Sequence, residues 1–493
     1  MYPTLEEVRA LARSGDYRRV PVCRELYADR YTPVEVMRTL RAAAKHCFLL
    51  ESADNNQRWG RYSFLGYAPA MELTCVDGQL RIREGVDGEN CTERFETVDH
   101  PGDAIRAVLK DYRAPKVEGM PTFCGGLVGF FSYDYLKYAE PTLRGKTEDR
   151  DFRDVDLMLF DRVIAFDHYR QKLMLITSVP TDNIDEGYRK AEADCEEMEA
   201  LLNSGARAVF KPLKMKEPLS LHFTKDEFCS MVTRAKKYIY EGDIFQVVLS
   251  NPLTAAADGS LFDTYRVLRT LNPSPYMFYF TSDDIEVAGA SPETLARLED
   301  GTLFTFPLAG TRRRGVDAEE DAALERELLS DEKELAEHNM LVDLGRNDLG
   351  RVCELNTVHV DHYLAIERFS HVMHIGSTVS GKLRKDRDAV DAVDSILPAG
   401  TLSGAPKIRA CEIIGELEGR KRGIYGGAVG YLDFSGNMDT CIAIRLAYKK
   451  NGRICVQSGA GIVADSVPEK EFRECADKAQ AVVRALRAAE GGI

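Results

Sequence analysis

Two pairs of glutamates with the same spacing are the residues whose types most directly suggest chemistry. Glu334 and Glu337 lie three positions apart in one expected helix, and Glu471 and Glu474 repeat this Glu-x-x-Glu spacing near the C-terminus. Residues three apart share one helix face, so each pair can direct both carboxylates at one ion. Four carboxylates without convergent Cys or His favour a hard cation, Mg²⁺ rather than Zn²⁺.

The same spacing is also common on solvated helices. Glu196 and Glu199 have it in a long polar segment that shows no other sign of a site. Spacing alone therefore leaves open an ordinary surface role for both pairs.

Two glycine-containing segments could bind an anion. Gly459-Ala460-Gly461, expected just before the last helix, can present backbone N–H groups. Residues 398–407, Pro-Ala-Gly-Thr-Leu-Ser-Gly-Ala-Pro-Lys, form an expected loop whose hydroxyls and N–H groups suit a carboxylate. Neither segment has Walker A spacing or a Rossmann fingerprint, and glycines more often simply form turns.

Basic and titratable residues add a third group of candidates: His371, His374, Arg445 and Lys478. A single histidine is usually a satisfied core residue. Arg445 directly follows the apolar segment Cys441–Ile444 in an expected strand, and a buried arginine needs an anionic partner. It therefore suggests an anionic ligand.

Helices and short strands must position these residues. Thr224 with Glu227 forms a capping box at the start of a helix that ends at Gly242. Other helices are expected over residues 32–46, 184–202, 319–329, 332–344 and 468–489, and strands over 48–52, 62–66, 244–249, 429–433 and 440–448. Strands and helices without regular βαβ alternation favour an α+β fold.

Length and composition limit the remaining possibilities. The chain has 493 residues, which suggests two large domains or one intertwined pair. A basic stretch with two prolines, Lys211–Pro218, predicts a boundary between residues 1–215 and 216–493. The net charge of −14 disfavours nucleic acid and anionic membranes as partners.

Other features predict a cytoplasmic protein. The N-terminus has early acidic residues and no long apolar core, which is unlike a signal peptide. No apolar run is long enough to span a bilayer. The 12 cysteines form no C-x-x-C pair, so they are expected to be reduced, mostly buried side chains.

Several segments in this order closely resemble the chorismate-utilising enzymes. They are Gly242–Ser250, Ala290–Thr294, Ala336–Leu344, Pro398–Thr401 and Gly459–Gly461, and the resemblance is strongest over residues 220–490. It implies an α+β fold of four layers, α/β/β/α, in which two large antiparallel sheets pack face to face.

The resemblance also implies roles for the candidate residues. Glu337 and Glu474 would bind Mg²⁺, with Glu334 and Glu471 supporting through water, and the ion would hold the ring carboxylate of chorismate. Glu293 would be the general acid for the 4-hydroxyl, and His374 would take the ring proton. The remaining substrate pocket would consist of Gln246, Thr401, Lys478, Tyr425, Arg445, Gly310, Thr311 and Gly459-Ala460-Gly461.

Two positions distinguish between members of that family. Isochorismate and salicylate synthases have a lysine that activates water where this chain has Gln246, so ammonia fits better as the nucleophile. Aminodeoxychorismate synthases usually have Pro-Ile-Lys-Gly-Thr where this chain has Pro307-Leu308-Ala309-Gly310-Thr311. Ala309 offers no nucleophile, which favours the component I branch of the anthranilate synthases. Aminodeoxychorismate synthase component I remains the alternative.

A regulatory site is implied by two further segments. Leu49–Ser52 and Asn272–Phe278 resemble paired segments that bind feedback-inhibiting tryptophan. An acidic side chain and an apolar slot suit an amino acid with a large ring. The residues expected at this site are Leu50, Glu51, Ser52, Pro273, Tyr276, Met277 and Phe278. A strand end and a turn would explain the same segments without regulation.

The chain shows no glutaminase motif, since a Gly-x-Cys-x-Gly elbow is missing. Ammonia is therefore expected from a separate glutamine amidotransferase subunit, in a heterotetramer, or from free ammonia. A non-catalytic tryptophan-binding protein on the same fold is a second alternative. The Arg-rich segments Thr311–Gly315 and Gly419–Gly423 are expected to be solvated loops.

Overall fold

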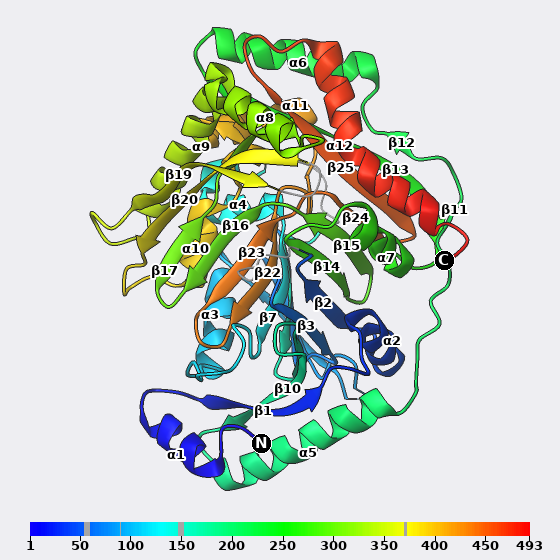
Figure 1. Cartoon of the computed structure of the whole chain (residues 1–493), viewed down its shortest axis with the longest axis vertical. Helices are drawn as coiled ribbons and strands as arrows, with labels where there is room; N and C mark the ends of the chain where they lie inside the picture. The colour runs from blue at the N-terminus through cyan, green and yellow to red at the C-terminus, as the bar shows by residue number, and fades with distance from the viewer. Residues whose placement is uncertain (54–59, 89, 146–151, 369–371) are drawn as a thin grey trace.

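Two large sheets dominate the computed structural model, which describes residues 1–53, 60–88, 90–145, 152–368 and 372–493 (Figure 1). Every ladder between named strands within these ranges is antiparallel. Sheet A has 13 strands there and sheet B has 12.

Sheet A follows one continuous order of strands. They are β1 (Arg19–Tyr27), β10 (Lys172–Pro180), β9 (Val163–Asp167), β3 (Tyr62–Tyr67), β2 (Cys47–Glu51), β14 (Tyr276–Thr281), β15 (Ile285–Ser291), β24 (Leu446–Lys450), β25 (Arg453–Ile462), β13 (Gln246–Asp258) and β11 (Lys214–Met215). β12 (Ser220–Leu221) and β21 (Gly404–Ala405) also pair with β13. Strands from both sides of residue 215 therefore share one sheet.

Sheet B also combines strands from both sides of residue 215. Its order is β18 (Leu308–Arg313), β20 (Val372–Lys382), β17 (Thr302–Thr305), β16 (Thr294–Glu299), β23 (Met438–Ile442), β22 (Ala428–Asp433), β7 (Gly126–Phe131), β8 (Val155–Phe160), β4 (Met71–Val76), β5 (Gln79–Glu84) and β6 (Thr92–Thr97). β19 (His359–Arg368) pairs with β20. β7 and β8 are buried along their whole length, as expected for strands covered on both faces.

The helices lie outside the two sheets. They are α1 (Leu5–Arg13), α2 (Pro33–Ala43), α3 (Gly102–Asp111), α4 (Leu136–Ala139), α5 (Ile184–Asn203), α6 (Lys225–Tyr240), α7 (Phe262–Leu271), α8 (Ala318–Ser330), α9 (Glu332–Gly350), α10 (Ala389–Ile396), α11 (Lys407–Glu418) and α12 (Pro468–Ala489). The described part contains no helix long and apolar enough to cross a membrane.

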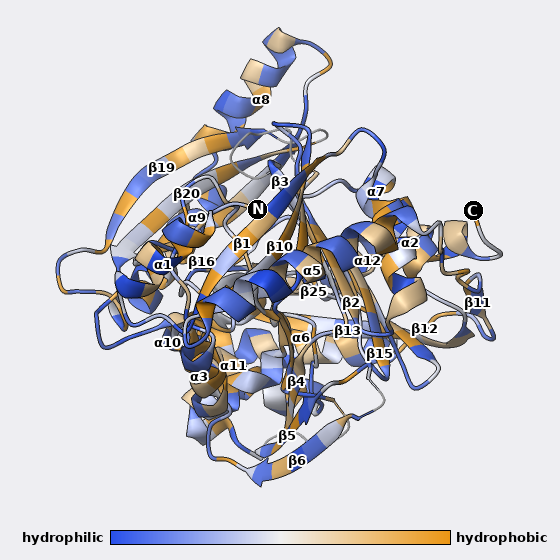
Figure 2. Ribbon diagram, turned by 90° about the horizontal axis from the view of Figure 1, so that it is seen from below, coloured by the Kyte–Doolittle hydropathy of each residue, from blue (hydrophilic) through white to orange (hydrophobic). Residues whose placement is uncertain are grey.

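Separate hydrophobic clusters define the layers. Phe48 and Phe278 of sheet A pack with Phe130 and Phe160 of sheet B in the cluster between the sheets. A second cluster joins sheet A to α2, α5, α7 and α12, and a third joins sheet B to α3, α9 and α10. Figure 2 shows largely hydrophobic strands behind the more hydrophilic outer helix α5. The predicted α+β, four-layer fold is confirmed.

The expected elements were found with two differences that affect the site. The expected strand 440–448 is interrupted: β23 ends at Ile442 and β24 begins at Leu446. Residues 459–461, expected before a helix, belong to β25 and pair with β13. The capping box of Thr224 and Glu227 is present at α6. All twelve cysteines are free, as predicted.

Candidate active site

Glu293 lies where the chain passes from one sheet to the other. β15 of sheet A ends at Ser291 and β16 of sheet B begins at Thr294, so residues 292 and 293 form the connection. The Thr401 hydroxyl donates to Glu293 Oε1 at 3.0 Å. Burial raises the pKa of the Glu293 carboxyl to about 7, against the opposing effects of Thr401, Arg445 and Lys478. A carboxyl that keeps its proton near neutral pH can act as a general acid.

Arg445 lies on a second connection between the sheets, from β23 to β24. Its backbone has φ of 51°, a left-handed conformation that is costly for a side chain of this size. Within the described residues its guanidinium makes no ion pair, and burial lowers its pKa. A half-buried guanidinium without a carboxylate partner is suited to an anionic ligand.

His374 is oriented by a bulge in the edge strand β18. The register between β18 and β20 shifts at Gly310, whose φ is 64°. His374 Nδ1 lies 2.9 Å from the Gly310 carbonyl oxygen and 3.0 Å from the Thr311 hydroxyl. A carbonyl can only accept, so Nδ1 holds the proton of the neutral ring and Nε2 can take one. Burial lowers the His374 pKa, which favours the neutral, basic form.

The glycines of β25 allow two polar side chains to approach the backbone. A Cβ at Gly459 would lie 2.8 Å from the Tyr425 hydroxyl, and one at Gly461 would lie 2.9 Å from Gln246 Nε2. β13 pairs with residues 459–461 on one edge, while β24 stops pairing at Val456 on the other. Backbone groups on that open edge remain available to a ligand.

Because the backbone at Gly459 is so closely packed, a larger residue there should reduce activity. In Gly459→Ala the new Cβ would also lie 2.8 Å from the Leu249 carbonyl oxygen, so the strand must shift. Because displacement by about 1 Å can cost about 100-fold in rate, we expect kcat/KM to fall by about that factor. Gly350→Ala, where a Cβ meets nothing within 4 Å, is the matched control. Equal activity of the two variants would contradict this role.

The two Glu-x-x-Glu pairs lie near the starts of two helices whose charged side chains influence each other. Glu334 and Glu337 lie in the first turns of α9, and Glu471 and Glu474 lie in those of α12. Burial and the charge of Glu334 raise the pKa of Glu337, and Lys478 of α12 lowers it. Burial and the charge of Glu474 raise the pKa of Glu471, and Lys333 of α9 is among the groups that lower it. Charges on each helix therefore act on the other.

The four glutamates differ in whether they form a salt bridge. Arg312 Nη1 lies 3.5 Å from Glu334 Oε1. Lys478 Nζ lies 2.8 Å from Glu474 Oε1, at an exposed position. Within the described ranges, no salt bridge reaches Glu337 or Glu471, and no group of three or more His, Cys, Asp or Glu side chains could hold a metal ion. Two poorly compensated carboxylates still fit Mg²⁺, which often binds one or two protein carboxylates with substrate and water.

Residues around Tyr425 correct the expectation of a solvated loop at 419–423. Arg422 is 2% exposed and donates to Glu418 and to the Leu402 and Val248 carbonyls. Its guanidinium also lies over the rings of Tyr133 and Tyr425. These bonds hold the loop after Thr401 beside β13. The alternation of charge and glycine in the sequence did not distinguish this buried arginine from an exposed one.

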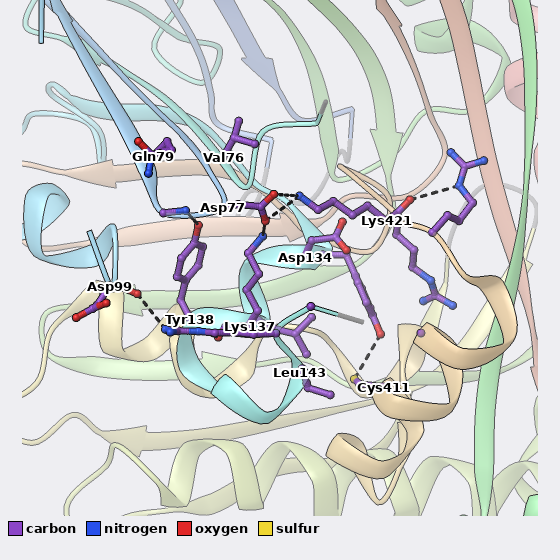
Figure 3. A pocket seen from close by; sticks show the side chains of 18 of the residues that line it. Val76, Asp77, Gln79, Asp99, Asp134, Lys137, Tyr138, Leu143, Cys411 and Lys421 are labelled. Carbon is purple, nitrogen blue, oxygen red and sulfur yellow. Dashed lines mark hydrogen bonds and ion pairs between the residues drawn. The ribbon is translucent and has the colours of Figure 1, made fainter. Parts of the chain in front are cut away.

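Lys421 is buried as well, beside a cavity with a volume of about 730 Å³. Its ammonium and that of Lys137 both reach Asp77 (Figure 3). None of the predicted site residues lines this cavity. A cavity of only about 40 Å³ lies beside Glu293 and Thr401.

The segments expected to bind tryptophan pair in sheet A, since Leu50 and Glu51 of β2 oppose Phe278 and Met277 of β14. They line a cavity of about 250 Å³. Six of the seven predicted residues contribute to its wall: Leu50, Glu51, Ser52, Tyr276, Met277 and Phe278. Pro273 does not line the cavity, whereas its neighbour Pro275 does.

The residues on the opposite wall of this cavity were not predicted from the sequence. Sheet B supplies this wall with Arg297, Val429, Gly430, Tyr431, Asp439 and Cys441. Glu51, the acidic side chain expected at this site, already has two partners within the protein: Arg269 pairs with it at 2.9 Å and Tyr265 donates to it. His371, another candidate from the sequence, lies outside the described residues.

Comparisons with known proteins agree with this arrangement. Residues 8–484 match the family described as chorismate binding enzyme. Anthranilate synthase component 1 of Acetivibrio thermocellus is 44% identical over 496 residues, covering 99% of both chains. The protein of the same name from Pseudomonas aeruginosa is 44% identical over 503 residues, also covering 99% of both.

Solved structures show the same fold. The crystal structure of anthranilate synthase component I from Streptococcus pneumoniae superposes with a TM-score of 0.74 and 37% identity, covering 86% of this chain and 92% of that one. The menaquinone-specific isochorismate synthase of Escherichia coli shares the fold at a TM-score of 0.67 and 19% identity, over 98% of each chain. The chain belongs to the family of chorismate binding enzymes.

Proposed function

We propose that this protein is the synthase component that converts chorismate and ammonia to anthranilate and pyruvate, the first committed step of tryptophan biosynthesis. The observation that supports this most directly is the juxtaposition of Glu293, whose pKa is raised to about 7, with the Arg445 guanidinium, which forms no salt bridge among the described residues. An acid and an anion-binding group are what a substrate with two carboxylates and a departing hydroxyl requires.

The side chains have separate tasks in this proposal. Arg445, Tyr425 and the open edge of β25 bind the enolpyruvyl carboxylate. Glu293 protonates the 4-hydroxyl, which leaves as water while ammonia adds to C2 of the ring. His374 then takes the C2 proton through Nε2, pyruvate leaves and the ring becomes aromatic.

Glu337 and Glu474 would hold Mg²⁺, with Glu334 and Glu471 supporting through water. When bound, the ion would neutralise the ring carboxylate of chorismate and stabilise charge as the hydroxyl departs. The raised pKa values of Glu337 and Glu471 support this assignment, because a nearby cation would offset the repulsion within each pair.

Gln246 and Ala309 support ammonia as nucleophile and pyruvate as second product. The Gln246 side chain bonds to Glu337 and lies beside Gly461, where it cannot act as a base toward water. Ala309 offers no amine in β18. Aminodeoxychorismate formation is the rival activity, and binding of tryptophan without catalysis is the rival from another class.

One assay separates these functions. The purified chain is incubated with chorismate, Mg²⁺ and ammonium salt at alkaline pH, and the products are identified. We expect anthranilate and pyruvate in equal amounts. Aminodeoxychorismate without pyruvate would support the first rival, and absence of turnover would support the second.

The cavity between the sheets supports feedback inhibition by tryptophan. Ser52→Phe should fill part of its volume of about 250 Å³. We expect tryptophan binding to weaken by about 100-fold or more, because added bulk in a packed site costs about 1–3 kcal/mol and direct ligand contacts are lost. Calorimetric titration measures this directly. Equal affinity in both proteins would remove the cavity as the regulatory site.

We also propose separate roles for the two parts of the chain and a partner subunit that supplies ammonia. Residues 1–215 supply β2 for the regulatory cavity, whereas residues 216–493 supply all the catalytic candidates. Ammonia would come from glutamine through a separate amidotransferase subunit, in a cytoplasmic heterotetramer. The missing nucleophilic cysteine elbow supports a separate source of ammonia.

A further inference from the structure

The 250 Å³ cavity lies between the two sheets, so a bound molecule would contact both. Leu50 and Tyr276 line it from sheet A, and Tyr431 and Cys441 line it from sheet B. Glu293 lies on the short connection between the same sheets. A change in how the sheets are placed against each other must therefore be accommodated at this connection.

Tyr276 makes a direct bond across the sheets. Its hydroxyl lies 2.8 Å from Asp439 Oδ1 and 2.9 Å from the Thr294 hydroxyl, and both of those residues belong to sheet B. The phenol has one proton, so it donates to the Asp439 carboxylate and accepts from Thr294. Thr294 is the residue that follows Glu293 in the chain. One hydroxyl of the cavity wall is thus bonded to the neighbour of the proposed acid.

A second link passes through Ser291, which opposes Tyr276 in the β14–β15 ladder. Ser291 Oγ donates to the Ile442 carbonyl at 2.7 Å, and the Glu293 N–H donates to Ser291 Oγ at 3.4 Å. The Ile442 N–H in turn donates to the Glu293 carbonyl at 2.9 Å. The backbone of Glu293 is therefore bonded to both sheets.

We infer that Tyr276, Ser291 and Thr294 are positioning residues that couple occupancy of the cavity to the placement of the Glu293 carboxyl. This inference rests on the proposed function, in which an amino acid with a large apolar side chain occupies the cavity. A ligand affects catalysis only if it binds two arrangements of the protein differently. The Tyr276 side chain lines the cavity, and its hydroxyl bonds to Thr294, the neighbour of Glu293 in the chain.

Two substitutions test the coupling, and both remove a hydroxyl. Thr294→Val leaves the cavity wall unchanged, because Thr294 does not line it. Tyr276→Phe removes the bridging oxygen itself. Tyr279→Phe is the matched control: Tyr279 lies on the same strand, is fully buried and donates to Glu286 at 2.7 Å, away from Glu293.

The measurement combines calorimetric binding of L-tryptophan with ammonia-dependent turnover. Ammonia replaces glutamine, so blocking of a partner subunit cannot produce the inhibition. The coupling is the ratio of kcat/KM for chorismate without and with saturating tryptophan, commonly about 5–150-fold for such effects. We expect Thr294→Val to bind tryptophan within about twofold of wild type while the coupling falls at least about fivefold. Tyr276→Phe should lose coupling similarly, and Tyr279→Phe should keep it.

The possible outcomes distinguish the inferred coupling from the proposed function. If Thr294→Val and Tyr276→Phe bind tryptophan and are inhibited as strongly as wild type, the inferred coupling is wrong while the proposed function stands. If wild type binds no tryptophan, regulation through this cavity is wrong and the inference fails with it. If Tyr279→Phe loses coupling equally, the effect is general loosening and the specific role of Tyr276 is refuted.

Discussion

Glu293→Gln should lower kcat by about 10²–10⁴-fold, the usual contribution of a general acid. Glutamine preserves size and can still accept the Thr401 hydroxyl bond seen at 3.0 Å, but it cannot supply a proton. The departing hydroxyl would then leave unprotonated, at a much higher barrier. Single-turnover formation of anthranilate measures the chemical step, and unchanged thermal unfolding would show that the fold is retained.

The pH dependence of this variant is a sharper test. Burial raises the pKa of Glu293 to about 7, so the protonated, active form predominates below that value and is lost above it. At constant free ammonia, kcat/KM for wild type should therefore decline as pH rises through about 7 in the free enzyme. Glu293→Gln should lack this decline. An unchanged alkaline limb in the variant would assign the titration to another group.

Glu337→Gln should also have a large effect, reducing Mg²⁺-dependent turnover by about 10³-fold. The substitution removes a charge from a half-buried carboxylate that has no salt bridge among the described residues. Its amide could still bond to Gln246. We expect a higher Mg²⁺ requirement, measured as the half-saturating concentration in the ammonia-dependent assay, with little change in thermal stability.

A matched control exists for this second substitution. Glu196 has the same Glu-x-x-Glu spacing, but on α5 it pairs with Arg24 at 3.3 Å and is largely exposed. Exposed ion pairs contribute only about 0–1 kcal/mol, so Glu196→Gln should leave turnover and the Mg²⁺ requirement unaltered. Retention of full activity by Glu337→Gln would exclude that carboxylate from the metal site.

The sequence predicted most helices because their signals are local. α6 begins at its capping box, and α12 has the predicted bounds Pro468–Ala489. Residues 440–448 were predicted wrongly because their apolar pattern is continuous. The turn at Arg445 arises from passage between two sheets, which is a tertiary requirement that periodicity does not report.

The site was predictable to a similar extent. Leu50 and Met277 were predicted as parts of one site because their segments resemble a known pair. Tyr431 and Asp439 of the opposite wall, and the buried Arg422, depend on which strands face each other across the core. Sequence separation hides such neighbours, and only the packing of the sheets brings them together.

The pairing of β2 with β14 has a consequence for how the chain is made. Cys47–Glu51 must wait for Met277–Thr281 to find its neighbour, and β15 then requires β24, which ends at Lys450. Contacts so distant in sequence slow folding, and a chain that emerges from the ribosome at about 5–20 residues per second leaves early strands unpaired for tens of seconds. We expect nascent chains to depend on chaperones until nearly the whole protein has been synthesised.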